Sequence, residues 1–375
     1  MAGEHSGDQL GFKLMQALRR AKPDVVFSGV GGEAMVREGL PTLFPLTDIA
    51  VMGFVALIPH LPRLLARIRF AAEAIIANPP DVLVIIDSPD FTHRVAAKVR
   101  KALPALPIVD YVSPTVWAWR PGRAKAMTRY VNHVLALLPF EPAAHQRLNG
   151  PACTYVGHPL IERFDELRGD GNTGAAPQKP PMLLVLPGSR RSEIEHLMAD
   201  FGAAVALISQ KSGPLDVVLP AVASLIEPIR AAAAKWTVAP RIILGEAEKF
   251  AAFRTARAAI AASGTVTLEL ALAGVPMVVA YKVSAIETLA RFWITAPSFV
   301  LPNLILGENF IPEFIQSACT PQALADSLLP LLADSPGRAA QLAKLQALDA
   351  SMRLPEGQTP SDRAAEIILR AAAIE

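Results

Sequence analysis

MLLVLPGSRR at 182–191 decides the fold class, because it joins an apolar run through a Pro-Gly turn to a helical pattern. Met182–Leu186 is uniformly apolar, as expected of a strand that is buried on both faces of a parallel sheet. Similar short apolar runs alternate with helical patterns along the chain. The sequence therefore predicts an α/β protein with parallel sheets built from repeated strand and helix units.

Two domains are expected, because 375 residues exceed the size at which one hydrophobic core stops growing. RGDGNTGAAPQKPP at 168–181 loses apolar periodicity and gathers Gly and Pro, which is typical of a linker. We predict domains at 1–167 and 182–345 and carboxy-terminal helices at 346–375. The expected strands are 25–30, 82–87, 108–112, 134–138 and 154–156 in the first domain, and 182–186, 216–219, 241–244, 259–262 and 276–280 in the second.

The first domain departs from this pattern at its start. The chain opens on MAGEHSGD, a polar loop that leads into a helix with no strand before it. A doubly wound domain normally reaches such a loop from its central strand. We therefore expect the first strand of this domain to be missing.

Composition excludes several classes of protein. Apolar residues make up 52% and charged residues 19%, so the chain is globular rather than disordered. A formal charge of +2 argues against a nucleic acid partner. Cys153 and Cys319 fit no metal spacing and indicate two thiols in a reducing, cytoplasmic setting. No signal peptide or membrane span is predicted, since the nearly uncharged stretch 258–281 is interrupted by polar residues, Gly and Pro.

One loop of the second domain could hold a diphosphate. Gly188, Ser189 and Arg190 follow a strand and precede a helix, so backbone amides, the helix N-terminus and the guanidinium could together bind phosphate. An ordinary turn with Ser189 as the helix cap explains the same residues equally well.

A second loop repeats this layout. Ser263, Gly264 and Thr265 end a strand and lead into a helix that carries Glu269, a carboxylate able to accept both hydroxyls of a ribose. Thr265 as a cap with Glu269 near the helix N-terminus is the structural alternative. Ligands of open α/β sheets collect at the carboxyl ends of strands, so two such loops in one sheet favour the binding interpretation.

Asp87 ends the expected strand at 82–87, where it could deprotonate an acceptor hydroxyl. Local chemistry also allows Asp87 or Asp90 to cap the next helix, and His93 and His5 are rival bases. These alternatives stay open on local chemistry alone.

A membrane contact is suggested by VMGFVALIPHLPRLLARIRF at 51–70, which combines apolar residues with arginines and contains no acid. Phe54, Leu57 and Ile58 could enter an anionic lipid surface while Arg63 and Arg67 bind its headgroups. A buried loop followed by a core-facing amphipathic helix is the alternative. The Trp-rich segment at 111–120 suits a sugar or lipid face and a domain core equally.

Ordered motifs identify a family. They are AGEHSGD at 2–8, GVGG at 29–32, AVMGF at 50–54, IDSPDF at 86–91, YVSPTVWAWR at 111–120, LPFE at 138–141, VGHP at 156–159, LPGSR at 186–190, SGTVTLE at 263–269 and LPNLILG at 301–307. With these motifs the chain resembles the lipid-A-disaccharide synthase family over essentially its whole length. The family usually carries an apolar strand directly before AGE, and this chain does not.

The resemblance implies an inverting glycosyltransferase of the GT-B fold, with two Rossmann-like domains. It would join UDP-2,3-diacylglucosamine to 2,3-diacylglucosamine 1-phosphate, releasing UDP, without a metal or cofactor. Its place would be the anionic cytoplasmic face of the inner membrane, and a homodimer stays open. The helices at 346–375 would pack back on the first domain.

Site residues carry over position by position. Asp87 looks like the essential base, and Glu4 and Ser6 look like an acceptor-side loop. The nucleotide-sugar side would comprise Gly188, Ser189, Arg190, Ser263, Gly264, Thr265, Glu269 and Asn303. The alternatives are a UDP-N-acetylglucosamine epimerase of the same fold, which would need neither the 51–70 stretch nor the Trp-rich segment, and a non-catalytic paralogue.

Overall fold

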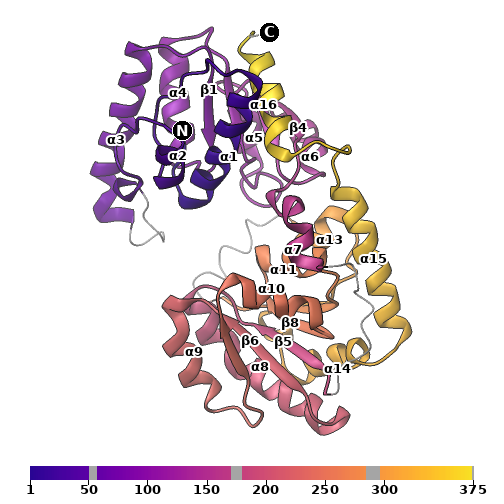
Figure 1. Cartoon of the computed structure of the whole chain (residues 1–375). Coiled ribbons are helices and arrows are strands. Elements are labelled where there is room, and N and C mark those ends of the chain that lie inside the picture. Colours follow the sequence, from indigo (N-terminus) through magenta and orange to yellow (C-terminus); the bar gives the residue numbers. More distant parts are fainter. Residues whose placement is uncertain (50–56, 170–179, 284–295, 374–375) are drawn as a thin grey trace. The chain divides into compact units, whose positions relative to one another are not determined.

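The computed structural model describes residues 1–49, 57–169, 180–283 and 296–373 (Figure 1). The chain divides into two compact units. The first unit consists of Met1–Pro159 and Leu354–Glu375, and the second of Leu160–Arg353. Each unit contains a parallel sheet with helices on both faces, so the predicted α/β class is confirmed.

The first unit contains a parallel sheet in the order β1-β2-β3-β4. Its strands are β1 (Leu83–Ile86), β2 (Ile108–Tyr111), β3 (His133–Ala136) and β4 (Ala152–Tyr155). Its helices are α1 (His5–Ala21), α2 (Glu33–Arg37), α3 (Leu57–Ala77), α4 (Thr92–Ala102), α5 (Gly122–Met127), α6 (Glu141–Arg147) and α16 (Pro360–Ala371).

Two buried cores flank this sheet. On one face Ile85 and Ile108 pack with Ile68 of α3 and Val95 of α4. On the other face, Ile86, Val109 and Leu135 pack with apolar side chains of α1 and α16. Strands covered on both faces are mainly apolar, which is why they could be found in the sequence.

The start of the chain lies beside β1. Ala2 forms a parallel bridge with Ile86, and its amide donates to the carbonyl of Val30 at 2.8 Å. Met1 accepts from the amide of Ile86 at 2.9 Å, and burial lowers the pKa of its ammonium group to about 5. The sequence predicts no strand before α1. In the structure Met1 and Ala2 take the place of a short strand, with hydrogen bonds to β1 on one side and to Val30 on the other.

The sequence predicts a strand at 25–30, and this prediction is wrong. The only ladder contact found there among the described residues is the isolated bridge from Gly29 to Thr42. Val26 is 90% exposed, so this run does not have the two covered faces of the other strands. Residues 25–30 have one hydrogen bond to Ala2, at Val30, and one bridge to Thr42, at Gly29. These contacts are too few for a regular β-ladder.

The second unit contains a parallel sheet in the order β10-β9-β8-β5-β6-β7. Its strands are β5 (Met182–Leu186), β6 (Asp216–Ala221), β7 (Arg241–Leu244), β8 (Ala258–Ala262), β9 (Met277–Tyr281) and β10 (Glu313–Ile315), of which β10 was not predicted. Its helices are α7 (Phe164–Arg168), α8 (Arg191–Ser212), α9 (Ile226–Ala233), α10 (Glu246–Thr255), α11 (Thr265–Leu272), α13 (Leu301–Leu306), α14 (Pro321–Leu332) and α15 (Pro336–Met352).

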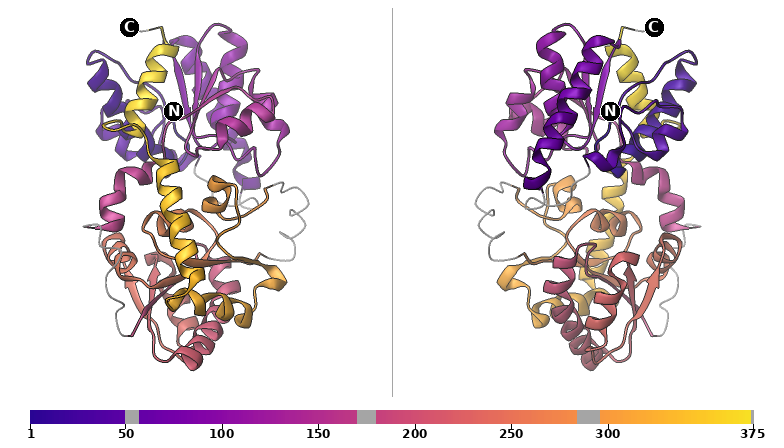
Figure 2. Two further views of the ribbon diagram at one scale, coloured as in Figure 1. Left: turned by 90° about the vertical axis from the view of Figure 1, so that its right-hand side faces the viewer. Right: turned by 90° about the vertical axis from the view of Figure 1, so that its left-hand side faces the viewer.

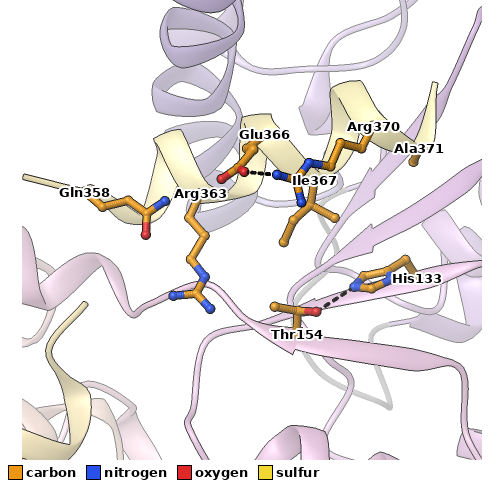
Figure 3. A pocket seen from close by; sticks show the side chains of 8 residues that line it. All are labelled: His133, Thr154, Gln358, Arg363, Glu366, Ile367, Arg370 and Ala371. Carbon is orange, nitrogen blue, oxygen red and sulfur yellow. Dashed lines mark hydrogen bonds and ion pairs between the residues drawn. The ribbon is translucent and has the colours of Figure 1, made fainter. Parts of the chain in front are cut away.

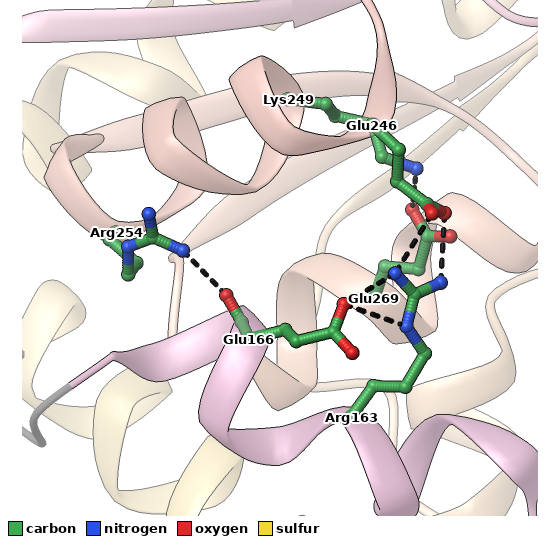
Figure 4. A network of polar contacts seen from close by, with 6 residues as sticks. All are labelled: Arg163, Glu166, Glu246, Lys249, Arg254 and Glu269. Carbon is green, nitrogen blue, oxygen red and sulfur yellow. Dashed lines mark hydrogen bonds and ion pairs between the residues drawn. The ribbon is translucent and has the colours of Figure 1, made fainter.

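Ion pairs attach α7 to the second unit (Figure 4). Arg163 binds Glu246 of α10 through two hydrogen bonds of 2.8 Å and also binds Glu166. Arg254 donates to the carbonyl of Glu166 at 2.6 Å. The contacts therefore divide the chain after Pro159, ahead of the predicted linker at 168–181, of which 170–179 lie outside the described residues.

The predicted terminal region 346–375 is shared between the two units. Its first residues belong to α15 in the second unit, and α16 belongs to the first unit, where it lies against α1 (Figures 1 and 2). Ala364, Ala365 and Ile368 of α16 are buried, and Arg20 binds Asp362 at 2.6 Å.

Asp8 provides a test of how the first unit is held together. Its buried carboxylate accepts from the amides of Gly32, Ala34 and Met35 at 2.8–3.1 Å, which fixes the start of α2 beside α1. Asp8→Ala should lower the free energy of unfolding by about 3 kcal/mol, since it leaves buried donors unpaired. Chemical denaturation measures this change.

Asp24→Ala is the matched control, because its side chain is 77% exposed. It should change the free energy of unfolding by less than about 0.5 kcal/mol. Equal stability of the two variants would contradict the anchoring role of Asp8.

Candidate functional site

Each sheet has one position where the order of strands reverses. In the second unit the chain starts at β5, adds β6 and β7 on one side, and then places β8 on the other. The loops after β5 and β8 therefore flank this position. In the first unit Ala2 pairs with the Val30 segment on one side and with β1 on the other. Open α/β sheets bind ligands at such reversal points, outside the carboxyl ends of the strands.

Asp87 lies at the reversal point of the first unit. It follows β1, and its Oδ2 accepts from the hydroxyl of Ser6 at 3.1 Å. Its Oδ1 accepts from the amide of Ser88 at 2.7 Å, and its carbonyl accepts from Thr92 at 2.7 Å. The structure therefore brings together two of the residues expected on the acceptor side.

Backbone strain is concentrated at this edge of the sheet. Asp87 and Ser88 have φ angles of 53° and 49°, and Val112, directly after β2, has a φ of 87°. Residues with a side chain rarely adopt such angles, and a β-branched residue least of all. Strain of this kind persists where the surroundings enforce one geometry, and it clusters at functional sites.

Glu4 joins this group. Partial loss of its water shell raises the pKa of Glu4, and the charge of Asp87 raises it further, while a hydrogen bond with Ser88 acts against both. Gly3 lets the two loops approach, because a Cβ at this position would lie 2.4 Å from Cβ of Ser88. Glu4, Ser6 and Asp87 thus form one acidic cluster from two distant segments.

A buried charged group lies on the strand next to β1. Asp110 of β2 is fully buried, and its Oδ2 lies 3.3 Å from Nε2 of His93. Burial raises the pKa of Asp110, and His93 acts against this rise. His93 also contacts the hydroxyl of Tyr130 at 3.2 Å through Nδ1. His93, a rival base in the sequence, is therefore engaged with Asp110 and Tyr130 inside the unit.

Glu141 is a second buried carboxylate, under the Trp-rich segment. It accepts from Nε1 of Trp117 at 3.1 Å and from the amide of Leu138 at 2.9 Å. Burial raises its pKa to about 7, although both hydrogen bonds act in the opposite direction. Trp117 packs edge-on against Phe140, so this part of the segment is held in the unit rather than presented freely.

The loop after β5 differs in detail from the expectation. Arg190, not Ser189, is the N-cap residue of α8, and the carboxylate of Glu193 accepts from the amides of Ser189 and Arg190 at 2.8 and 3.1 Å. These two amides are therefore already paired. The side chain of Arg190 is 76% exposed, and its guanidinium lies 3.5 Å from the carboxylate of Glu193.

The loop after β8 presents its carboxylate with a partner. Gly264 is the N-cap residue of α11, Thr265 is the first helical residue, and Ser263 donates to the carbonyl of Phe299 at 2.5 Å. Lys249 of α10 binds Glu269 at 2.8 Å, as Figure 4 shows. This ion pair fixes Glu269 beside the reversal point.

Asn303 is buried and does not face solvent. Its side chain is buried, and it both donates to the carbonyl and accepts from the amide of Ile311, at 2.9 and 3.0 Å. In this arrangement its carboxamide braces the segment before β10. It presents no polar group at the surface.

The 51–70 stretch is described only in part. Phe54 lies outside the described residues, and no side-chain environment is described for Leu57 and Ile58. Arg63 and Arg67 of α3 both bind Asp48, an acid outside the stretch that the sequence alone did not connect with them. Arg67 also lies over the ring of Phe44, so the two arginines are anchored with a net charge of +1.

Exposed apolar residues remain on this helix. Leu61 and Leu65 are 39% and 47% exposed, and residues four apart share one helix face. Across 1–49, 57–169, 180–283 and 296–373, no helix is both long and apolar enough to cross a membrane.

Within the described ranges, no cluster of three or more His, Cys, Asp or Glu side chains could hold a metal ion. Both cysteines are free, and burial raises the pKa of the Cys319 thiol to about 11.

Comparison with known proteins gives the family. The chain matches the lipid-A-disaccharide synthetase family over residues 1–367. It is 58% identical to the lipid-A-disaccharide synthase of Nitrobacter hamburgensis, over 98% of this chain and 94% of that protein. The chain belongs to the lipid-A-disaccharide synthase family. The corresponding protein of Rhodopseudomonas palustris strain HaA2 is 54% identical over the same shares. The chain is therefore a glycosyltransferase.

Solved structures agree on the fold. MurG of Acinetobacter baumannii is similar with a TM-score of 0.58 at 15% identity, over 99% of this chain and 98% of that one. A UDP-GlcNAc 2-epimerase of Neisseria meningitidis has a TM-score of 0.56 at 11% identity, over 98% and 97%. At these identities the likeness shows the fold alone, and this is the GT-B fold.

Sequence reasoning missed Ser88, Asp110, Glu193 and Lys249. Glu193 could have been found, because it stands three residues after Arg190, the spacing of a capping box. Lys249 and Asp110 could not, since each meets its partner only through the fold.

The raised pKa of Glu141 predicts how the stability of the first unit depends on pH. Its pKa of about 7 in the folded protein exceeds the ordinary value of 4.5, so the folded state is favoured while this group is protonated. Stability should therefore fall as pH rises from about 4.5 to about 7, by about 3 kcal/mol from this residue. Glu141→Gln should remove this part of the fall when unfolding is measured across the interval.

Glu73→Gln is the control, because Glu73 is an exposed carboxylate in the same unit. Its pH dependence should match that of the wild type. A Glu141→Gln curve parallel to the wild-type curve would show that burial does not raise the pKa of Glu141.

Proposed function

We propose that this chain joins UDP-2,3-diacylglucosamine to 2,3-diacylglucosamine 1-phosphate, giving lipid A disaccharide 1-phosphate and UDP. The family and relatives 52–58% identical that are named lipid-A-disaccharide synthase support this reaction. The observation that carries the mechanism is the cluster of Glu4, Ser6 and Asp87 at the reversal point of the first unit.

Asp87 acts as the base on the acceptor side. It takes the proton of the acceptor hydroxyl, whose oxygen attacks the anomeric carbon of the donor sugar from the face opposite UDP. The bond from that carbon to the diphosphate breaks, UDP leaves with the electron pair, and the configuration inverts. Ser6 donates to Asp87 and orients it for this step. No covalent enzyme intermediate is needed.

The second unit holds the donor. Arg190, largely exposed beside β5, stabilises the charge that develops on the diphosphate. Glu269 accepts the ribose hydroxyls, and Lys249 keeps its carboxylate in place. Gly188, Ser189, Ser263, Gly264 and Thr265 shape the two loops, and Asn303 holds the segment before β10 through Ile311. Neither role needs a metal ion.

Asp87→Asn tests the base. Because an amide cannot take the proton, turnover should fall by roughly two to four orders of magnitude while UDP binding is retained. Steady-state kinetics and UDP titration measure the two effects. Near-normal turnover would remove Asp87 as the base.

Arg190→Ala is the contrasting variant. Loss of a charge-assisted contact should weaken UDP binding by about tenfold or more. Unchanged UDP affinity and turnover would leave Arg190 as a helix-capping residue only.

UDP release from the diacylated donor, with and without the acceptor lipid, separates the alternatives. A transferase releases UDP only when the acceptor is present. An epimerase would convert the nucleotide sugar without the acceptor, and a non-catalytic paralogue would do neither.

Membrane contact belongs to the same proposal, because both substrates carry acyl chains. The exposed pair Leu61 and Leu65 on α3 would enter the lipid surface, with Arg63 beside them. The surface would be the anionic cytoplasmic face of the inner membrane.

Leu61→Ser combined with Leu65→Ser should reduce binding to anionic vesicles by at least about tenfold, because the apolar area that enters the lipid is lost. Vesicle flotation measures this binding. Val222→Ser, at a residue of the second unit that is 39% exposed, is the control and should bind like the wild type. Undiminished binding of the double variant would exclude this face.

A further inference from the structure

A cavity of about 650 Å³ lies in the first unit between α16 and the strands β3 and β4 (Figure 3). It is lined by His133, Thr154, Gln358, Arg363, Glu366, Ile367, Arg370 and Ala371. This volume is within the range of small-molecule sites, about 300–1,000 Å³.

The cavity is separate from the acidic cluster. It lies along β3 and β4, from His133, the first residue of β3, to Thr154, near the end of β4. Asp87 follows β1, which is separated from β3 by β2, and no residue of the acidic cluster lines the cavity. The proposed transfer reaction therefore makes no use of this cavity.

Arg363 is the central charge of the cavity. Figure 3 shows its side chain extending from α16 toward Thr154. Within the described residues, no hydrogen bond or ion pair joins its guanidinium to another side chain. Burial raises the pKa of Tyr155 to about 12, and the positive charge of Arg363 acts against this rise. Five donors of fixed geometry are thus presented to the cavity.

The other polar side chains leave the cavity positive. Glu366, the only acid among the lining residues, already binds Arg370 at 2.5 Å. His133 contacts the hydroxyl of Thr154 at 2.9 Å, and burial lowers the pKa of His133, so the ring is neutral at neutral pH. The carboxamide of Gln358 adds two further donors. With one carboxylate against two guanidinium groups, the net charge of the lining is +1.

We propose that this cavity binds the phosphate group of a small phosphorylated molecule. Arg363 would hold the phosphate through paired hydrogen bonds, the geometry that arginine offers to phosphate oxygens. Gln358 and Thr154 would donate to the remaining oxygens. Ile367 and Ala371 give the cavity an apolar wall for the rest of the ligand.

The test is calorimetric titration of the full chain with glycerol 3-phosphate in saturating UDP, which occupies the proposed nucleotide site of the second unit. The wild type should bind at a single saturable site. Arg363→Gln should weaken binding by about tenfold or more, because a charge-assisted contact is lost. Glu366→Gln should strengthen it by about threefold, since Arg370 loses its competing carboxylate.

Arg94→Gln is the matched control, an exposed arginine on α4, which packs on the other face of the sheet. It should bind like the wild type. Thermal unfolding of all variants separates loss of the site from loss of the fold, and Glu366→Gln tests the site by a gain that misfolding cannot produce.

A vesicle arm distinguishes the source of the phosphate. Flotation with phosphatidylglycerol vesicles is repeated with Arg363→Gln in the Leu61→Ser, Leu65→Ser background, which lacks the proposed membrane face. Arg363-dependent binding to vesicles alone would assign the phosphate to a lipid headgroup and support the site. Equal binding of Arg363→Gln and Arg94→Gln in both arms, or no saturable binding in either, would overturn it.

Discussion

In each unit one segment pairs with a neighbouring segment on both of its edges. The positions of the functional loops follow from this pairing. In the second unit β5 pairs with β6 on one side and with β8 on the other. In the first unit Ala2 takes the same position between the Val30 segment and β1. The chain returns to each of these segments later and pairs with its second edge. The loop after the segment and the loop after that later strand, which are distant in sequence, therefore lie side by side at the carboxyl edge of the sheet.

The two units use this shared geometry for different chemistry. At the edge of the first unit small residues bring two loops into close contact, and carboxylates from both loops meet there. At the edge of the second unit the corresponding residues are an exposed arginine and a carboxylate held by lysine. A base is best placed where acids can cluster, and a diphosphate is best bound where a guanidinium is exposed to solvent. The division of labour in the proposed reaction follows from these two compositions.

Buried acids hold the loops of the first unit in place. Asp8 binds three backbone amides, Asp110 lies beside His93, and Glu141 lies under Trp117. A buried carboxylate is costly unless it is paired, so each one favours a single arrangement of the segment that pairs with it. Asp8 fixes the start of α2, Asp110 the first turn of α4, and Glu141 the Trp-rich segment.

The sequence by itself determined the α/β class, most of the strands and the family, because buried parallel strands are continuously apolar and because the motifs keep their order along the chain. It also placed Asp87 at a strand end, Arg190 in the loop after a strand and Glu269 in the helix that follows another strand. Whether a strand-end residue caps a helix or faces a ligand was open, and tertiary structure decided what each one contacts. Contacts such as Ser6 with Asp87, Lys249 with Glu269, and Arg63 and Arg67 with Asp48 join residues up to 81 positions apart. Local sequence patterns indicate which face of a helix or strand a residue lies on, but not which distant residue it contacts. These partners are therefore identified only in the folded chain.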